Sequence, residues 1–210
     1  MRKFLVALLM VAGLAHAEGE SSGDFDYYLL SLSWTPSWCE TTGDARGSEQ
    51  CDAGQGFGFT LHGLWPQYET GWPSYCRHNF RQATRAQTAE MADIMGTSGL
   101  AWHQWKKHGT CAGMTAEAYF ELSRAAYAKI NRPEIFSQLP REIDILPRVV
   151  QEAFIEANPE LSADQIEITC KDGNIQEARI CLTKDLAFRK CSEQRRSCNM
   201  TRPYDLAPIR

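Results

Sequence analysis

Strands are predicted toward both ends of the chain, where apolar runs with interspersed polar residues are bounded by turn residues. Residues 24–34 are aromatic and apolar with polar residues between them, and Pro36 ends this pattern. A shorter run over 56–61 predicts a second strand. Near the other end, 165–170 and 175–182 flank a turn that contains Gly and Asn. These segments favour a sheet of mainly antiparallel strands.

Helices are predicted in the middle of the chain, where apolar residues recur with a helical period. One covers 83–94, and Thr115 is placed to cap another that extends to Ile130. Pro147 suits the first turn of a third helix, which ends before Asn158. This arrangement predicts an α+β fold, in which a mainly antiparallel β-sheet packs against several α-helices.

The first 17 residues have the layout of a secretory signal peptide. Two basic residues precede an apolar run, which ends at Ala15-His16-Ala17. Cleavage after this site predicts a single mature domain of residues 18–210, because no repeat, linker or change of composition divides the rest of the chain. No later stretch approaches the roughly 18 apolar residues of a membrane helix. We therefore expect a secreted or periplasmic protein without a membrane partner.

The cysteines predict a disulfide-stapled domain. There are eight, all in the exported part: Cys39, Cys51, Cys76, Cys111, Cys170, Cys181, Cys191 and Cys198. An even number in an oxidising compartment predicts four disulfide bonds, although these residues alone leave the pairing open. A zinc site is less favoured, because no two cysteines form a close Cys-x-x-Cys pair.

The net charge is acidic. Removal of the signal peptide takes two of the 22 basic residues and no acidic residue, which leaves 20 against 26 and a net charge of −6 with neutral histidines. A broad basic surface for tight nucleic-acid binding is therefore excluded. A local cationic cleft remains compatible with this balance.

One short segment, residues 101–108, concentrates polar and titratable side chains. If it is helical, four of them fall within an arc of about 140°: His103, Gln104, Lys107 and His108. Trp102 and Trp105 are then expected to point the other way, into the core. A zinc-protease helix needs two histidines four residues apart with a Glu between them, and this segment has neither feature.

Two imidazoles and a lysine can move protons and stabilise a phosphate. RNA carries its own nucleophile in the 2′-hydroxyl, so its cleavage needs no metal or other cofactor. One imidazole cannot serve both ends of an in-line displacement, and His62 is the natural second candidate. Trp65 follows it and offers an indole on which a base could stack.

Two segments together resemble the active-site segments of the ribonuclease T2 family: residues 59–66, which read FTLHGLWP, and residues 103–111, which read HQWKKHGTC. The resemblance implies that His108 removes the 2′-hydroxyl proton and that His62 protonates the 5′-oxygen. His103 and Lys107 would hold the phosphate. The expected product is a 2′,3′-cyclic phosphate, later hydrolysed to a 3′-phosphate, with little base specificity.

The resemblance also implies the disulfide pairing, and the chain departs from the family pattern at two positions. The implied pairs are Cys39 with Cys51, Cys76 with Cys111, Cys170 with Cys198, and Cys181 with Cys191. Gln104 stands where the family usually has a catalytic Glu, and Gln67 stands where some relatives use Asp in base recognition. We expect activity to survive the first change, because Gln104 would replace a supporting residue.

Three classes of function remain open. The first is a metal-independent endoribonuclease, a monomer whose partner is single-stranded RNA. The second is a catalytically impaired relative that binds RNA or a protein, which the amide at Gln104 would explain. The third is an exported binding module in which the histidines are structural, so that His62→Ala and His108→Ala would abolish no activity.

Overall fold

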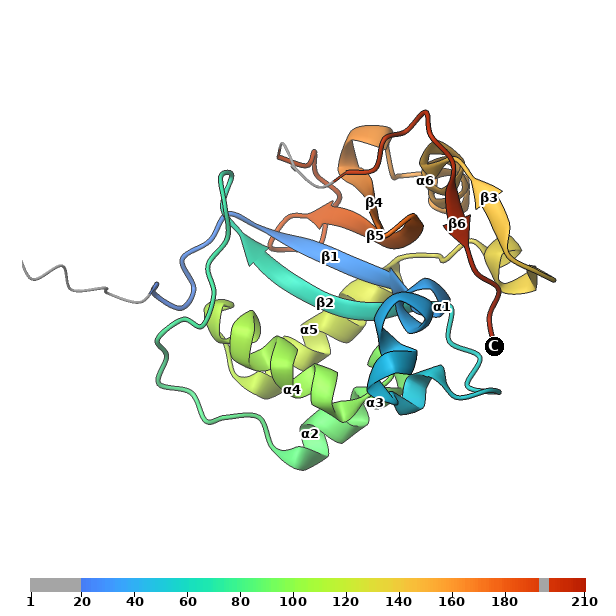
Figure 1. The fold of residues 1–210 in the computed structure, drawn as a ribbon. Helices are drawn as coiled ribbons and strands as arrows, with labels where there is room; N and C mark the ends of the chain where they lie inside the picture. The colour runs from blue at the N-terminus through green and yellow to red at the C-terminus, as the bar shows by residue number, and fades with distance from the viewer. Residues whose placement is uncertain (1–19, 193–196) are drawn as a thin grey trace, which may run out of the picture.

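The computed structural model describes residues 20–192 and 197–210, and the predicted signal peptide lies outside them. Its centre is a six-stranded sheet in the order β2-β1-β5-β6-β3, with β4 also paired to β5 (Figure 1). The strands are β1 (Tyr27–Trp34), β2 (Phe59–Gln67), β3 (Ile143–Ile145), β4 (Ile166–Lys171), β5 (Asn174–Leu182) and β6 (Tyr204–Leu206).

The sheet is mainly antiparallel, as predicted. All strand pairs are antiparallel except β5 and β6, which are joined in parallel at Asn174 and Asp205. The predicted strand pair near the C-terminus is confirmed as β4 and β5. The strands β3 and β6 were not predicted, because three residues are too few to show an alternating pattern.

The second strand is longer than predicted. The sequence pattern ends it at Leu61, but β2 continues to Gln67 and includes Pro66. Proline has no backbone N–H to donate and is therefore confined to edge strands or bulges. It is accommodated here because β2 lies at the edge of the sheet and pairs with β1 alone among the described strands. His62 and Trp65 consequently lie within a strand and not in a loop.

Helices fill the middle of the chain: α1 (Thr35–Trp38), α2 (Arg85–Glu90), α3 (Ala92–Met95), α4 (Ser98–Lys107), α5 (Ala116–Lys129) and α6 (Pro147–Ala157). The last two confirm the predicted helices, and the Thr115 hydroxyl accepts the hydrogen bond of the Ala118 N–H. The helix predicted over 83–94 is divided in two at Met91. Six short helical turns complete the set: η1 (Cys39–Gly43), η2 (Asp44–Arg46), η3 (Glu49–Cys51), η4 (Gly109–Cys111), η5 (Glu134–Gln138) and η6 (Ala163–Gln165).

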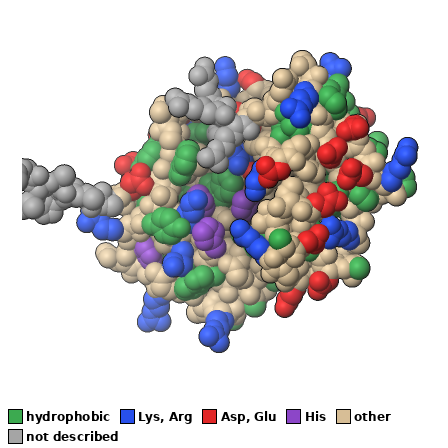
Figure 2. All heavy atoms as spheres, in the orientation of Figure 1, with side chains coloured by type: hydrophobic (Ala, Val, Ile, Leu, Met, Phe, Trp, Pro, Cys, Tyr) green, Lys and Arg blue, Asp and Glu red, His purple; other side chains and the backbone are tan. Residues whose placement is uncertain are grey.

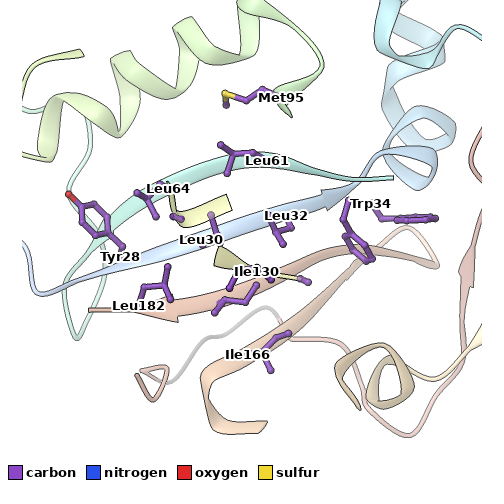
Figure 3. Packing of buried hydrophobic residues seen from close by; sticks show 14 of the residues in the cluster. Tyr28, Leu30, Leu32, Trp34, Leu61, Leu64, Met95, Ile130, Ile166 and Leu182 are labelled. Carbon is purple, nitrogen blue, oxygen red and sulfur yellow. The ribbon is translucent and has the colours of Figure 1, made fainter. Parts of the chain in front are cut away.

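The two faces of the sheet have different chemistry. Leu30, Leu32, Leu61 and Leu64 belong to the main core cluster (Figure 3), and α4 and α5 lie beside the same part of the sheet (Figure 1). Since side chains alternate along a strand, the residues between these apolar positions point to the other face. On β1 and β5 that face carries Ser31, Ser33, Glu177 and Arg179. We call this side the polar face.

All eight cysteines are paired, in the pattern that the family resemblance implied: Cys39–Cys51, Cys76–Cys111, Cys170–Cys198 and Cys181–Cys191. The bond from Cys76 ties the long segment after β2 to the turn that follows α4. Within residues 20–192 and 197–210, no helix combines the length and apolar character needed to cross a bilayer.

Loss of the Cys76–Cys111 bond is expected to destabilise the domain by roughly 2–4 kcal/mol, because a cross-link over a longer loop removes more entropy from the unfolded chain. This bond joins residues 35 apart, whereas Cys39–Cys51 joins residues 12 apart. Urea unfolding of the two double Cys→Ala variants measures both effects. A larger loss for the shorter loop would contradict the prediction.

Candidate active site

A β-bulge sets the position of His62. In the pairing of β2 with β1, Leu61 lies opposite Leu32 and Gly63 lies opposite Ser31, so His62 is an extra residue without a partner of its own. A bulge bends its strand and redirects the side chain. His62 reaches across the polar face toward β5, two strands away. The intervening side chains of β1 are serines, which leave room above the middle strand.

Glu177 on β5 meets His62. The Nδ1 atom of His62 lies 2.5 Å from Oε1 of Glu177, whose side chain is only 3% exposed. The other carboxylate oxygen accepts two hydrogen bonds from Arg179, at 2.8 Å from Nε and 2.6 Å from Nη2. Burial by itself disfavours the charged carboxylate, but the hydrogen bonds and charges of His62 and Arg179 outweigh it and lower the pKa of Glu177 to about 2. Glu177 is therefore a buried anion.

Sequence analysis missed Glu177 and Arg179. They alternate with Ala178 and Ile180 along β5, which is the usual pattern of a strand with one solvated face. Their one distinguishing feature in the sequence is a pair of opposite charges two residues apart, on the same face of a strand. Only the pairing of β5 with β1 shows that these two charges lie near His62.

The other half of the site comes from α4. This helix begins after Thr97, whose hydroxyl accepts from the Leu100 N–H, and it carries Gln104 and His108 inward, where they are 2% and 5% exposed. The indole of Trp65 donates a 2.7 Å hydrogen bond to Oε1 of Gln104. Its ring stacks on His108 at 5.1 Å between centroids and meets His62 edge-on at 5.2 Å. Trp65 thus contacts both imidazoles and joins β2 to α4.

Gly63 permits this contact. A Cβ atom at this position would collide with Nε1 of Trp65 and with Oε1 of Gln104. The hydrogen bond between the indole and the amide passes directly beside the Gly63 backbone. The glycine in the sequence pattern is therefore required by packing between β2 and α4.

The remaining predicted groups of α4 face solvent. His103 is exposed, Lys107 is half-buried, and Lys106 is exposed as expected. Burial first, and then the charges of Lys107 and His62, lower the pKa of His103. The expectation that Trp102 points into the core is wrong, because its side chain is 39% exposed while Trp105 is fully buried. The two residues lie only about 60° apart around the helix, but Trp105 is on the side that meets the core and Trp102 is at its solvent-exposed margin.

His108 occupies a different electrostatic setting from His62. Burial, followed by the nearby charges of Lys107, His62 and His103, lowers its pKa to about 3. Its Nδ1 atom has no hydrogen-bond partner among the described residues. The ring is therefore held neutral, whereas the ring of His62 lies beside the Glu177 carboxylate.

Two further residues lie outside this arrangement. Gln67 is buried at the end of β2, and its side-chain amide donates to the Pro66 carbonyl at 2.9 Å. His78, which we expect to be structural, accepts from the Phe80 N–H and lies against Trp105. The base-recognition role of Gln67 stays a prediction.

A possible metal cluster elsewhere lacks the necessary ligands. Cys39, Asp44 and Cys51 bring ligand atoms within 4.8 Å of one another. The two sulfurs are bonded to each other, and a disulfide provides no thiolate to a metal. Only the Asp44 carboxylate remains, and it is paired with Arg210.

Figure 2 shows how charge is distributed on one face of the molecule. Histidine side chains lie together with Lys and Arg side chains, while many Asp and Glu side chains lie on the right of the same view. The overall charge of −4 therefore does not describe the local field around the histidines. The predicted cationic patch exists on an acidic protein.

The fold and the site define a class: a disulfide-stapled α+β domain in which an edge strand and a helix each present a histidine to one tryptophan. The model of the ribonuclease T2 family matches residues 25–191. The chain belongs to the ribonuclease T2 family.

Relatives of known name agree with this membership. A ribonuclease of Aeromonas hydrophila is 38% identical over 138 residues, which cover 63% of this chain and 61% of that protein. The intracellular ribonuclease LX of Solanum lycopersicum is 27% identical over 150 residues, which cover 62% of this chain and 59% of that protein. The chain thus spans about three fifths of the length of these relatives.

Solved structures share the fold. An RNase-related protein from Calystegia sepium superposes with a TM-score of 0.66 at 21% identity, covering 87% of this chain and 97% of that chain. RNase NT in complex with 5′-AMP gives a TM-score of 0.63 at 21% identity, covering 89% of this chain and 100% of that chain. The predicted α+β architecture is confirmed.

Replacement of Gly63 by Ala is expected to separate Trp65 from Gln104 and to cost roughly 1–3 kcal/mol of stability, as overpacking in a filled core does. Near-ultraviolet circular dichroism reports the displaced indole, and urea unfolding reports the stability. Gly99→Ala is the matched control, because the nearest atom to its added Cβ is 4.0 Å away. Equal spectra and equal stability for Gly63→Ala and wild type would contradict this account of the site.

Acid is expected to destabilise the protein through His108. The pKa of His108 is about 3 in the folded protein and about 6.5 in an unfolded chain. Its contribution to the free energy of unfolding is complete above about pH 6.5 and is lost as the pH falls toward 3, because only the unfolded chain binds the proton there. Urea titrations between about pH 7 and 4 should show a smaller loss of stability for His108→Asn than for wild type. Parallel losses would contradict the buried neutral ring.

Proposed function

We propose that this protein is a metal-independent endoribonuclease that cleaves single-stranded RNA by transesterification with low base specificity. The observation that carries the proposal is that two imidazoles contact the indole of Trp65. His62 lies beside the buried Glu177 carboxylate, and His108 is buried with cationic side chains nearby. Family membership and the named ribonucleases among the relatives support the same activity.

The first step moves one proton at each end of the reacting phosphate. Neutral His108 takes the proton of the 2′-hydroxyl, and the 2′-oxygen forms a bond to phosphorus. The bond from phosphorus to the 5′-oxygen breaks, and protonated His62 gives its proton to that leaving oxygen. The products are a 2′,3′-cyclic phosphate and a free 5′-hydroxyl. In a second step, water opens the cyclic phosphate to a 3′-phosphate with the two histidines in reversed roles.

The electrostatic settings support this division of labour. A general base must be unprotonated, and the lowered pKa of His108, about 3, keeps its ring neutral well into the acidic range. A general acid must carry a proton, and we assign this role to His62, whose Nδ1 lies 2.5 Å from the Glu177 carboxylate. The opposite assignment would place the acid among cations and the base beside an anion.

His103 and Lys107 are assigned to the phosphate. Both lie on the exposed side of α4, and His103 is within electrostatic range of His62. Cations at this position offset the charge that builds up on the phosphorus oxygens in the transition state. The overall charge of −4 does not oppose this, because turnover needs only a local cationic site.

Low base specificity follows from the residues assigned to the base. Stacking on Trp65 tolerates any base, because every base has a π-face. Gln67 has its amide engaged with Pro66. The structure of RNase NT carries 5′-AMP, which supports a nucleotide site in this fold.

Gln104 is compatible with catalysis in this arrangement. Its amide oxygen accepts the hydrogen bond of the Trp65 indole, so the residue helps to hold the ring that contacts both histidines. This role requires an acceptor and no charge. The catalytically impaired alternative is therefore not favoured. Four disulfide bonds further support an oxidising compartment, secreted or periplasmic.

The oxidised mature protein is expected to cleave a short RNA in excess chelator and to leave its 2′-deoxy counterpart intact. The first product should end in a 2′,3′-cyclic phosphate, identified by mass spectrometry. His62→Ala and His108→Ala should each lower the rate by roughly 10²- to 10⁴-fold, as loss of a general acid or base does. Lys106→Ala, an exposed change on the same helix, is the control.

Two outcomes would contradict the proposal. Cleavage of the 2′-deoxy substrate would exclude the internal nucleophile. Absence of cleavage by folded wild-type protein, with activity restored by Gln104→Glu, would show that the amide had ended catalysis and that the fold serves another purpose.

A further inference from the structure

The carboxylate of Glu177 lies in an unusual position for a charge. It is 3% exposed and lies on the polar face of the sheet, where it contacts His62 and Arg179. Taking a carboxylate out of water costs several kcal/mol unless its partners compensate. A purely structural contact at this position could be made by apolar side chains without that cost. The charge itself therefore has a use.

We propose that Glu177 is a positioning residue for His62, and that it supplies from β5 the negative charge that Gln104 does not supply from α4. The inference rests on the proposed function. Glu177 does not touch the substrate and acts only through the imidazole.

The contact determines which nitrogen of His62 meets the substrate. Glu177 accepts the hydrogen bond from Nδ1, so this nitrogen keeps its proton in both charge states of the ring. Nε2 is then the nitrogen that gives its proton to the 5′-oxygen. After that transfer His62 is neutral, with a free electron pair on Nε2 and its Nδ1–H still bonded to Glu177. This is the tautomer that can take a proton from water in the second step.

The contact also holds the orientation of the ring. His62 lies in a bulge and its side chain is 34% exposed, so neither pairing nor burial alone determines how the imidazole is turned. A hydrogen bond of 2.5 Å to a buried acceptor provides that constraint. The acceptor is itself held, because Arg179 binds its second oxygen with two nitrogens.

Arg179 connects this network to the rest of the site. Its guanidinium lies 5.3 Å from the centre of the Trp65 ring, which stacks on His108. Opposite Arg179 on β4 lies Glu167, and burial raises the pKa of Glu167 to about 7. The charged and titratable groups around the contact are His62 on β2, Glu177 and Arg179 on β5, Glu167 on β4, and His103, Lys107 and His108 on α4. Among these, Glu177 is the one whose carboxylate is bonded to His62.

The test separates the general acid from the general base by the leaving group. In a dinucleoside phosphate, the leaving 5′-oxygen needs a proton. In a nucleoside 3′-(4-nitrophenyl phosphate), the leaving group is 4-nitrophenolate, which is stable as an anion and needs no proton. Glu177→Gln should lower kcat for the dinucleotide roughly 10- to 100-fold, part of what a general acid contributes, with little change in KM. Its rate on the nitrophenyl ester should stay within about threefold of wild type.

A pH profile gives an independent readout. The alkaline limb of kcat/KM reports loss of the proton from the general acid, and removal of the anion beside His62 should move that limb to lower pH. The acidic limb belongs to His108 and should not move. A variant that is merely misfolded would lower the rate on both substrates at every pH.

Matched variants complete the design. His62→Ala, like Glu177→Gln, should lose activity on the dinucleotide and keep it on the nitrophenyl ester. His108→Ala should lose activity on both substrates. Glu167→Gln removes a carboxylate beside the same arginine without contacting His62, and its activity should match wild type on both. If Glu177→Gln does not fold, the wild-type protein still provides a test: its NMR spectrum should contain a strongly deshielded imidazole proton that disappears in folded His62→Ala.

Each outcome decides between the two proposals. Equal effects of Glu177→Gln on both substrates in a folded protein, or absence of the deshielded proton from wild type, would overturn the role of Glu177 while leaving the ribonuclease intact. Absence of cleavage of the dinucleotide by wild type would instead overturn the proposed function.

Discussion

The site depends on the contact that the Trp65 indole makes between an edge strand and a helix. Its N–H bonds to Gln104 and its ring stacks on His108, so the strand cannot shift relative to α4 without breaking both interactions. The edge-on contact with His62 extends the same constraint to the second histidine. Gly63 allows the two elements to approach this closely, and the bulge beside it turns His62 toward the polar face. Two histidines from different elements are thereby held around one rigid ring.

The same arrangement places two chemically identical side chains in different electrostatic surroundings. His108 is enclosed, with cations nearby, and its pKa falls to about 3. His62 is partly open to solvent and lies beside a buried carboxylate that β5 places on the polar face. This difference is the basis on which we propose His108 as the general base and His62 as the general acid. The acidic balance of the whole chain has little influence on it, because charges this close are screened far less than charges across the molecule.

Substitution at position 104 has a consequence for how the site is built. An amide preserves the acceptor that the Trp65 indole needs, while it removes a charge from the buried end of α4. The structure also contains a buried carboxylate, that of Glu177, in contact with His62. Its anchoring by Arg179 keeps it charged in a position where burial alone would favour the neutral form.

Local patterns were sufficient to predict much of the protein, and the failures have physical causes. The helices after Thr115 and Pro147, the C-terminal strand pair and the disulfide count follow from caps, periodicity and composition, which act over a few residues. The histidines, Lys107 and Gln104 could be singled out because they crowd into two short segments. Trp102 was misplaced because helical geometry says which residues share a face, and not which face meets the core.

What the sequence determined by itself was most of the longer strands and helices, the two motif segments and the chemistry that their side chains can perform. Only the tertiary structure decided that β2 extends through Pro66 as an edge strand, that His62 turns out of a bulge, and that Glu177 and Arg179 complete the site. These features depend on the pairing of strands far apart in the chain, β2 with β1 and β1 with β5. The hydrophobic pattern of a strand does not show which distant strand it pairs with. It also does not show that a charged side chain becomes buried between two such strands.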